Sequence, residues 1–184
     1  MRRLYSYLRP IGVAITALAF LTSCASQVQV DNTLPQRLKD QINRIDPEAG
    51  VQLEYIPIPA GEQISLKVGA MDYTLNRVFQ GMLREMLTAK FDTLSARAEN
   101  RVKVNVNYLN LNRESYGNSI NRVDMAVTVE LQHGYKTHSK EFELSTSSDV
   151  EGYSVPSGQI RNMLLQFALH INDYIDQNWS RTQA

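Results

Sequence analysis

The stretch that decides the fold is DYTLNRVFQGMLREMLTAKF, residues 72–91, because its apolar residues recur every three or four positions. This spacing is typical of an amphipathic helix with one apolar face. The polar residues between them fall on the opposite face. The pattern predicts a helix that packs on a sheet, and the residues of its buried face are Leu75, Val78, Phe79, Met82, Leu83, Met86 and Leu87.

The residues before this helix predict two short strands. Apolar and polar residues alternate over residues 51–55 and again over residues 64–68, which is the pattern of half-buried strands. Pro57, Pro59 and Gly61 separate the two runs and exclude a long central strand there. We therefore expect two short paired strands ahead of the helix.

Three longer strands are predicted after the helix. Residues 102–111 alternate but change phase near Tyr108, which indicates a bulge. Residues 123–132 alternate strictly, and residues 137–144 return after a turn at residues 133–135. A hairpin of this kind gives an antiparallel sheet with one solvated face and one face against helices.

A second long helix is predicted near the end of the chain. Its apolar residues follow the helical spacing, and they are Ile160, Met163, Leu164, Phe167, Ala168, Ile171, Tyr174 and Ile175. The order of elements is then β-β-α-β-β-β-α. We predict a single α+β domain over residues 50–184, with one mainly antiparallel sheet and both long helices packed on one of its faces.

The first residues predict the cellular location of the protein, and they are not part of the predicted fold. Arg2, Arg3 and Arg9 give a basic start, and the uncharged run IGVAITALAFL follows at residues 11–21. This run is too short to cross a bilayer core, which takes about 20 apolar residues. A basic start, a short apolar core and small residues at its end are typical of a secretory signal, which we expect to be cleaved as residues 1–23.

The end of this signal, Leu21-Thr22-Ser23-Cys24, resembles the bacterial lipobox. The resemblance implies that the Cys24 thiol receives a lipid and that cleavage occurs just before it. Acyl chains on this new N-terminus anchor such a protein, because each buried CH₂ contributes about 0.8 kcal/mol. The alternative is an ordinary signal peptide beside an incidental cysteine. Since Cys24 is the only cysteine, the mature domain has no disulfide.

Residues 24–49 are expected to connect the anchor to the domain. They begin with the lipidated Cys24, continue as a polar tether, and include a short helix over residues 34–45. Position 25 holds Ala25, whereas an Asp there tends to retain enterobacterial lipoproteins in the inner membrane. By that resemblance we expect the protein in the outer membrane, lipid-anchored and facing the periplasm.

Charge and motifs exclude several classes of function. The predicted signal contains three of the 19 basic residues and none of the 19 acidic ones, so the mature chain has more acidic than basic residues. Its sequence shows no basic stripe of the kind that binds nucleic acid. The patterns HExxH, GxSxG, GxGxxG and the P-loop are absent. We therefore predict no enzymatic activity, no cofactor and no metal. A metal ion shared by His133 and His138 across the hairpin is the alternative.

Polar strand residues and loop aromatics make up the candidate partner surface. Asn recurs through VNVNYLNLN, residues 104–112, although Asn is poorly suited to strands. One interpretation is a solvated strand face. The other is a contact surface centred on Asn107 and Tyr108. Loops often carry function, which adds the loop aromatics Tyr116, Tyr135 and Tyr153.

The layout over residues 50–178 resembles the small outer-membrane lipoproteins of the YajG type. The matching stretches are LNRVFQGMLREMLTAKF, VKVNVNYLNLN, VDMAVTVEL and the loop DVEG with its following helix. The lipopolysaccharide-assembly lipoprotein LptE and the auxiliary lipoproteins of lipid-transport ABC systems are similar in pattern. The resemblance implies a fold and a location, and it implies no catalytic residues.

Three functional hypotheses follow. The first is a non-enzymatic accessory or partner-binding subunit of a membrane assembly, whose envelope protein partner docks on loops or on a sheet edge. The second is a periplasmic carrier of a lipid or another small ligand, which needs an apolar pocket. The third is a cell-wall hydrolase, which needs a cleft with convergent polar groups of perturbed pKa.

Overall fold

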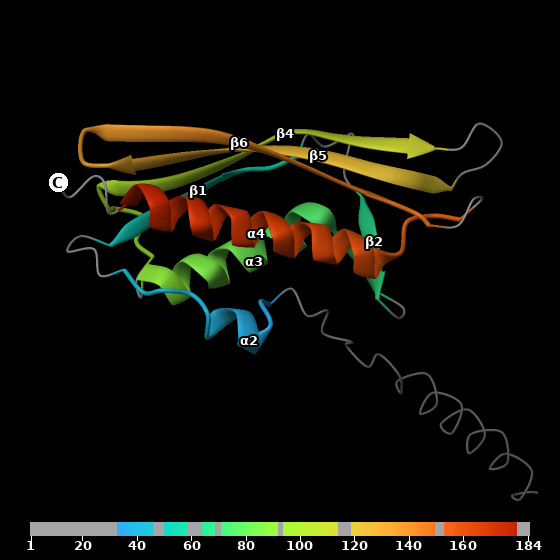
Figure 1. Cartoon of the computed structure of the whole chain (residues 1–184), viewed down its shortest axis with the longest axis horizontal. Helices are drawn as coiled ribbons and strands as arrows, with labels where there is room; N and C mark the ends of the chain where they lie inside the picture. The colour runs from blue at the N-terminus through green and yellow to red at the C-terminus, as the bar shows by residue number, and fades with distance from the viewer. Residues whose placement is uncertain are drawn as a thin grey trace, which may run out of the picture.

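In the computed structural model, the described residues are 33–45, 50–58, 64–68, 71–91, 94–113, 119–149 and 153–179. Figure 1 shows how the elements follow one another in space. They are α2 (Gln36–Lys39), β1 (Val51–Ile56), β2 (Ser65–Val68), β3 (Met71–Thr74), α3 (Leu75–Phe91), β4 (Asn100–Arg113), β5 (Ile120–His133), β6 (Lys136–Ser147) and α4 (Ser157–Trp179).

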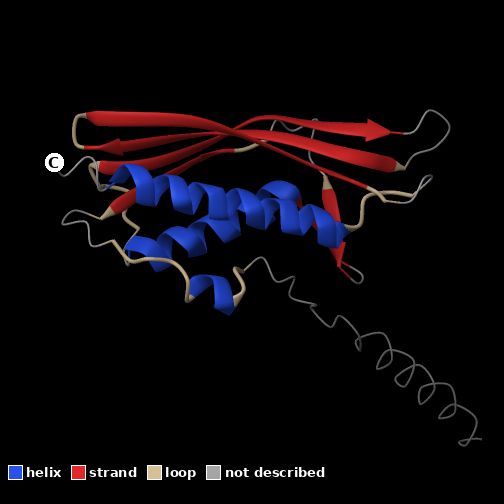
Figure 2. Ribbon diagram, viewed as in Figure 1, coloured by secondary structure: helices blue, strands red, loops and turns tan. Residues whose placement is uncertain are grey.

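The domain consists of two layers, a sheet and the helices that cover one of its faces (Figure 1, Figure 2). The sheet has the strand order β1-β4-β5-β6. β4, β5 and β6 pair antiparallel, whereas β1 lies parallel to β4 at the edge. α3 and α4 both lie against the same face of the sheet. The predicted α+β class, with a mainly antiparallel sheet and both long helices on one side, is confirmed.

The hydrophobic core fills the space between the two layers. All seven apolar residues predicted for the buried face of α3 have at most 1% of their surface exposed. They pack against inward residues of the sheet such as Val104 and Val127, and against α4, where the rings of Phe79 and Phe167 lie 5.9 Å apart. Each buried aliphatic or aromatic side chain contributes about 2 kcal/mol to stability.

The second predicted strand does not join the main sheet. β2 pairs instead with β3, and the two form a separate antiparallel hairpin. The expected helix start at Asp72 is wrong, because residues 71–74 form β3 and α3 begins at Leu75. Pairing two segments this close in sequence costs little chain entropy, and it satisfies backbone groups before the helix starts. The Leu75 N–H then donates to the Ile64 carbonyl at 2.8 Å.

The bulge and the long hairpin lie where the sequence predicts them. The register between β4 and β5 shifts between Val106 and Tyr108, so Asn107 is the extra residue of the bulge. Because of this shift, Val106 and Leu109 are both buried. The turn between β5 and β6 contains Gly134 with a φ of 58°, a left-handed conformation that suits glycine.

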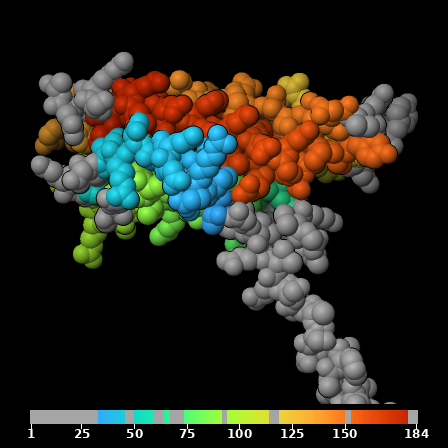
Figure 3. All heavy atoms as spheres, turned by 60° about the horizontal axis from the view of Figure 1, so that its bottom comes forward, coloured from blue at the N-terminus to red at the C-terminus, as the bar shows by residue number. Residues whose placement is uncertain are grey.

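The segment ahead of the domain, residues 33–45, packs on the helix layer on the side away from the sheet (Figure 1, Figure 3). The backbone N–H groups of Leu34 and Ile45 donate to the Glu85 carboxylate and the Lys90 carbonyl, each at 2.8 Å. The helix predicted for this segment is wrong in length: α2 covers four residues, because these contacts with α3 hold the rest in an irregular path. Among the described residues, no helix is long and apolar enough to span a membrane.

Candidate functional site

Asn107 and Tyr108, the predicted centre of the partner surface, lie on the open face of the sheet, which α3 and α4 leave uncovered (Figure 2). The Asn107 amide donates to Thr128 Oγ1 at 2.8 Å and to Glu141 Oε1 at 2.9 Å. The Tyr108 hydroxyl donates to the Glu143 carboxylate. These polar groups therefore satisfy one another across β4, β5 and β6.

Tyr108 is held in one position by this pairing. Tyr108, Ala126 and Glu143 form one row across the three strands. Since the tyrosine side chain must cross β5 to reach Glu143, it covers Ala126, which is fully buried although its register places it on the open face. The hydrogen bond to Glu143, together with the charges of Asp124 and Glu141, raises the pKa of Tyr108 to about 12. Tyr108 is thus a neutral hydrogen-bond donor at ordinary pH.

The other predicted surface aromatics do not join this centre. Tyr135 is fully exposed at the tip of the β5–β6 hairpin, and Tyr153 is 67% exposed. Tyr153 lies near the opposite end of β5, because the neighbouring Val155 N–H donates to the Ile120 carbonyl at 2.7 Å. At ~3.3 Å per residue, the length of β5 separates the two tyrosines by roughly 40 Å. Tyr116 lies outside the described residues, as do the lipobox residues Leu21, Thr22, Ser23 and Cys24.

His133 and His138 are placed by packing and strand pairing. The His133 ring lies on Trp179, with ring centroids 4.9 Å apart, and His138 stands opposite Leu131 in the β5–β6 ladder. Among the residues that the structure describes, no group of three or more His, Cys, Asp or Glu side chains lies close enough to hold a metal ion.

The free edge of β1 is a candidate site that the sequence does not reveal. Among the described strands, β1 pairs with β4 alone, and a single isolated bridge joins Val51 to Leu94 on its other side. On the other side, the Val51 carbonyl accepts a hydrogen bond from the Ser95 N–H at 2.9 Å. Backbone groups of alternate strand residues point the same way, so Leu53 and Tyr55 present N–H and C=O groups along this edge. Those groups have no backbone partner within the described ranges.

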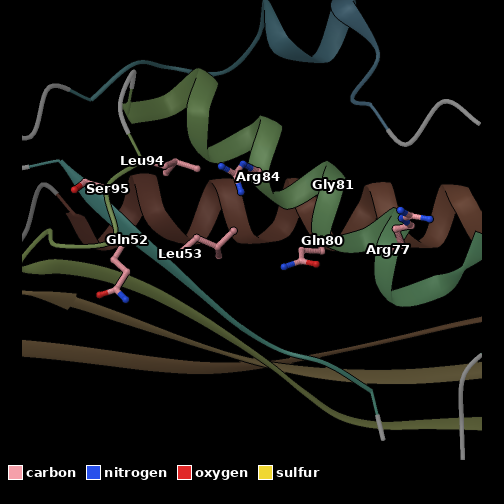
Figure 4. Close-up of a pocket in the computed structure, with 9 residues that line it drawn as sticks. Gln52, Leu53, Arg77, Gln80, Gly81, Arg84, Leu94 and Ser95 are labelled. Carbon is pink, nitrogen blue, oxygen red and sulfur yellow. The ribbon is translucent and has the colours of Figure 1, made fainter. Parts of the chain in front are cut away.

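A surface groove of about 400 Å³ lies between this edge and α3 (Figure 4). The α3 residues that line it are spaced by three and four positions, which places them on one side of the helix. Leu53 and Gln52 lie across from them on β1. We call this hollow the β1–α3 groove; its lining residues are Gln52, Leu53, Arg77, Gln80, Gly81, Arg84, Leu94, Ser95 and Ala96.

The β1–α3 groove is positively charged. Arg77 and Arg84 are both exposed, and neither has an ion-pair partner in the described part of the chain. The neighbouring carboxylate on α3, Glu85, accepts from Lys39 Nζ at 2.8 Å. The groove therefore offers two guanidinium groups to an anionic ligand.

A second hollow of about 460 Å³ lies on the other side of α3, toward the N-terminal segment. Arg84 borders both hollows, so this side chain can reach into either one. Five of its six lining residues are charged or polar, and the six are Lys39, Arg44, Arg84, Glu85, Thr88 and Ala89. Neither hollow is lined mainly by aliphatic or aromatic residues, which are typical of a site for an acyl chain.

One side chain of α3, Asn76, fixes the end of β1 beside the groove. Its Oδ1 accepts from the Tyr55 hydroxyl at 3.0 Å and from the Ile58 N–H at 2.9 Å, and its Nδ2 donates to the Ile58 carbonyl at 3.4 Å. Burial raises the pKa of Tyr55 far above its ordinary value, so its hydroxyl stays a donor. The two walls of the groove are thereby held at a set spacing.

Sequence patterns do not single out the residues of this groove. Arg77, Gln80 and Arg84 belong to the polar side of an amphipathic helix, which is the side expected to face solvent. Their common spacing on one side of the helix is the one signal in the sequence. It identifies a binding surface only in combination with the parallel pairing of β1 with β4 and the position of α3 beside β1.

Comparison with known proteins shows a similar fold in a solved structure. No protein-family model matches the chain, and no curated protein does. A solved structure from Xanthomonas campestris, of the family DUF330, is 9% identical with a TM-score of 0.54, covering 78% of this chain and 91% of its own. A minor lipoprotein from Acinetobacter baumannii is 17% identical with a TM-score of 0.39, covering 73% and 95%. The first match shows a common fold and, at that identity, nothing further.

Proposed function

We propose that the chain is a lipoprotein of the bacterial cell envelope that serves, without catalysis, as a partner-binding subunit of a membrane assembly. Residues 1–23 are the cleaved signal in this proposal, and acyl chains on Cys24 anchor the mature protein. With Ala25 next to the anchor, the protein belongs to the outer membrane and faces the periplasm. The resemblance of its sequence pattern to lipoproteins of the YajG type supports this proposal.

The observation that carries the proposal is the docked start of the domain. The Thr33 carbonyl accepts from Arg161 Nη2 at 3.1 Å, and the next residue, Leu34, is bonded to Glu85 at 2.8 Å. The path is therefore fixed from Thr33 onward, and only the eight residues from Ala25 to Asn32 separate Thr33 from Cys24. Fully extended, this connection spans at most about 30 Å. A lipid on Cys24 keeps the folded domain close to the membrane surface.

A partner-binding role is supported by the surfaces of the domain. The β1–α3 groove combines free backbone groups with two arginines, which suits a polar partner. The alternative of a lipid or small-ligand carrier requires an apolar pocket. The space between sheet and helices is instead filled by core side chains such as Phe79 and Phe167, both fully buried.

The test of the anchor is the intact mass of the protein isolated from membranes, measured beside a Cys24→Ala variant. We expect a chain that lacks residues 1–23 and carries acyl mass, and we expect that mass to be absent from the variant. An unmodified Cys24 on a secreted chain would overturn the proposal.

The test of location uses a single substitution next to the anchor. Wild-type protein should follow outer-membrane markers in a density gradient of an enterobacterial host. Ala25→Asp should move it to the inner-membrane fraction while the acyl mass is unchanged. If the wild-type protein and Ala25→Asp show the same distribution between the inner-membrane and outer-membrane fractions, the outer-membrane assignment is contradicted.

A further inference from the structure

We infer that the β1–α3 groove binds an extended acidic segment of a partner protein, which adds to the free edge of β1 as a new strand. This inference rests on the proposed partner-binding function and names the chemistry of the partner. Strand addition supplies affinity through main-chain hydrogen bonds, and the side chains next to the edge supply specificity.

The backbone part of the site is short and bounded at both ends. At one end the Val51 carbonyl is taken by the Ser95 N–H, and at the other the Ile58 N–H is taken by Asn76. The open edge therefore lies between these two points and offers Leu53 and Tyr55. A segment of about four or five residues fills it at ~3.3 Å per residue.

The charges of the groove select the side chains of that segment. Arg77 and Arg84 are seven positions apart on α3, which is about 10 Å along the helix axis. Carboxylates on alternate residues of a strand are about 7 Å apart on one face. Arginine side chains are long enough to bridge this difference and bind carboxylates through two parallel hydrogen bonds. The groove thus favours an extended segment with alternating acidic residues.

Apolar contacts are available on both faces of the segment. Leu53 lines the groove beside the arginines and is half-buried, so its remaining surface can contact the aliphatic stems of the acidic side chains. On the other face of β1, Ile56 is 37% exposed and is one of the exposed large hydrophobic residues of the domain. A segment that alternates acidic and aliphatic residues meets the arginines with one face and Ile56 with the other.

The opposite edge of the sheet is less suited to this role. β6 carries charges of both signs, including Lys140, Glu141 and Glu143, which is a common way of blocking an edge. Lys140 Nζ also lies 4.9 Å from the ring of Phe142 and 5.9 Å from that of Tyr174. An incoming acidic strand at β6 would meet Lys140 on one face but Glu141 and Glu143 on the other, whereas at β1 it meets Arg77 and Arg84.

The experiment uses the full mature chain, purified from membranes in a neutral detergent, and four labelled octapeptides. The first alternates Glu and Val, and the second has Gln for each Glu. The third and fourth are the acidic peptide with methyl groups on alternate backbone nitrogens, one peptide for each of the two phases. Fluorescence polarisation measures binding, and hydrogen exchange measures protection of residues 51–58. The double variant Arg77→Ala/Arg84→Ala is compared with Arg37→Ala/Lys136→Ala, which removes two exposed cations elsewhere.

We expect the acidic peptide to bind and to protect Leu53 and Tyr55 from exchange. The Gln peptide and at least one methylated peptide should bind about tenfold more weakly, since each loses charge-assisted or ladder hydrogen bonds. The groove variant should lose the preference for Glu over Gln, and the control variant should keep it.

Three results overturn the inference. Equal binding of the Glu and Gln peptides removes the charge selection, and binding without protection of β1 removes the strand addition. If the two arginines are needed for binding phosphatidylglycerol vesicles and no peptide binds, the groove contacts the membrane instead. Fluorescence polarisation reports on peptide binding, whereas intact mass reports on the lipid at Cys24. A protein that carries the lipid but binds no peptide would therefore contradict this inference and leave the proposed anchor intact.

Discussion

Lys90 Nζ in α3 lies 2.7 Å from Asp176 Oδ1 in α4, and the lysine side chain has no exposed surface. The same Nζ donates to the Asn43 carbonyl at 3.1 Å. One buried cation therefore joins both long helices and the N-terminal segment, residues 33–45. An ion pair in such a position contributes little net energy as a whole, but breaking it from one side costs several kcal/mol.

The first prediction concerns this pair. Asp176→Asn leaves a buried ammonium without its counter-charge and should lower the free energy of unfolding by about 3 kcal/mol. Lys90→Met keeps the volume and removes the charge, so the loss should be smaller. Urea unfolding of the two variants checks the order; an equal loss for both would mean that packing and not charge dominates at this position.

The second prediction concerns the clamp between β1 and α3. Asn76→Ala removes three hydrogen bonds and leaves the Ile58 N–H without its partner, which should cost about 2 kcal/mol of unfolding free energy. Tyr55→Phe removes one of the three and should cost about 1 kcal/mol. Hydrogen exchange at Ile58 should rise in the first variant only. Unchanged exchange at Ile58 in Asn76→Ala would show that the clamp does not hold the strand end.

The third prediction follows from the pKa of Tyr108, raised from 10.0 to about 12. A raised folded-state pKa gives a stability contribution that is complete below pH 10 and lost as the pH rises through 12. Glu143→Gln removes the carboxylate that accepts the phenol proton, so the pKa of Tyr108 should fall toward 10.0. Ultraviolet titration of phenolate, with Tyr108→Phe to assign the signal, measures the shift. A pKa that stays near 12 in the Gln variant would assign the shift to another cause.

The fourth prediction compares two glycines with open space around an added Cβ. Gly134 has a φ of 58°, so Gly134→Ala should destabilise the domain by about 1 kcal/mol through backbone strain alone. Gly158 lies in the first turn of α4, where alanine is the better helix former, so Gly158→Ala should stabilise it by up to about 1 kcal/mol. Thermal unfolding of both variants should show shifts of opposite sign.

The sequence predicts those parts of the fold that depend on local periodicity. The stripe from Leu75 to Leu87 is buried in full, and the change of phase at Tyr108 corresponds to a real bulge. The position of Gly134 in the long hairpin is also correct. Each of these features is determined by residues that are neighbours along the chain, which is why a single sequence carries the information.

The parts that could not be predicted depend on which strand lies beside which. Residues 51–56 have the pattern of a strand, but nothing in them specifies a parallel partner 49 positions later in β4. The polar side of α3 has the same pattern whether it faces solvent or a sheet edge, so Arg77 and Arg84 carried no distinguishing signal. Likewise, the separation of Tyr135 from Tyr153 follows from the length of β5, which places two loops at opposite ends.

The arginines beside β1 also bear on how copies of the protein behave toward one another. An open strand edge can pair with the same edge of a second copy, and a high local concentration of the protein raises that risk. Two β1 edges brought together would also bring Arg77 and Arg84 of each copy close to those of the other. Like charges at that distance repel, so the two arginines that attract an acidic strand in the proposed complex also disfavour pairing between the β1 edges of two copies.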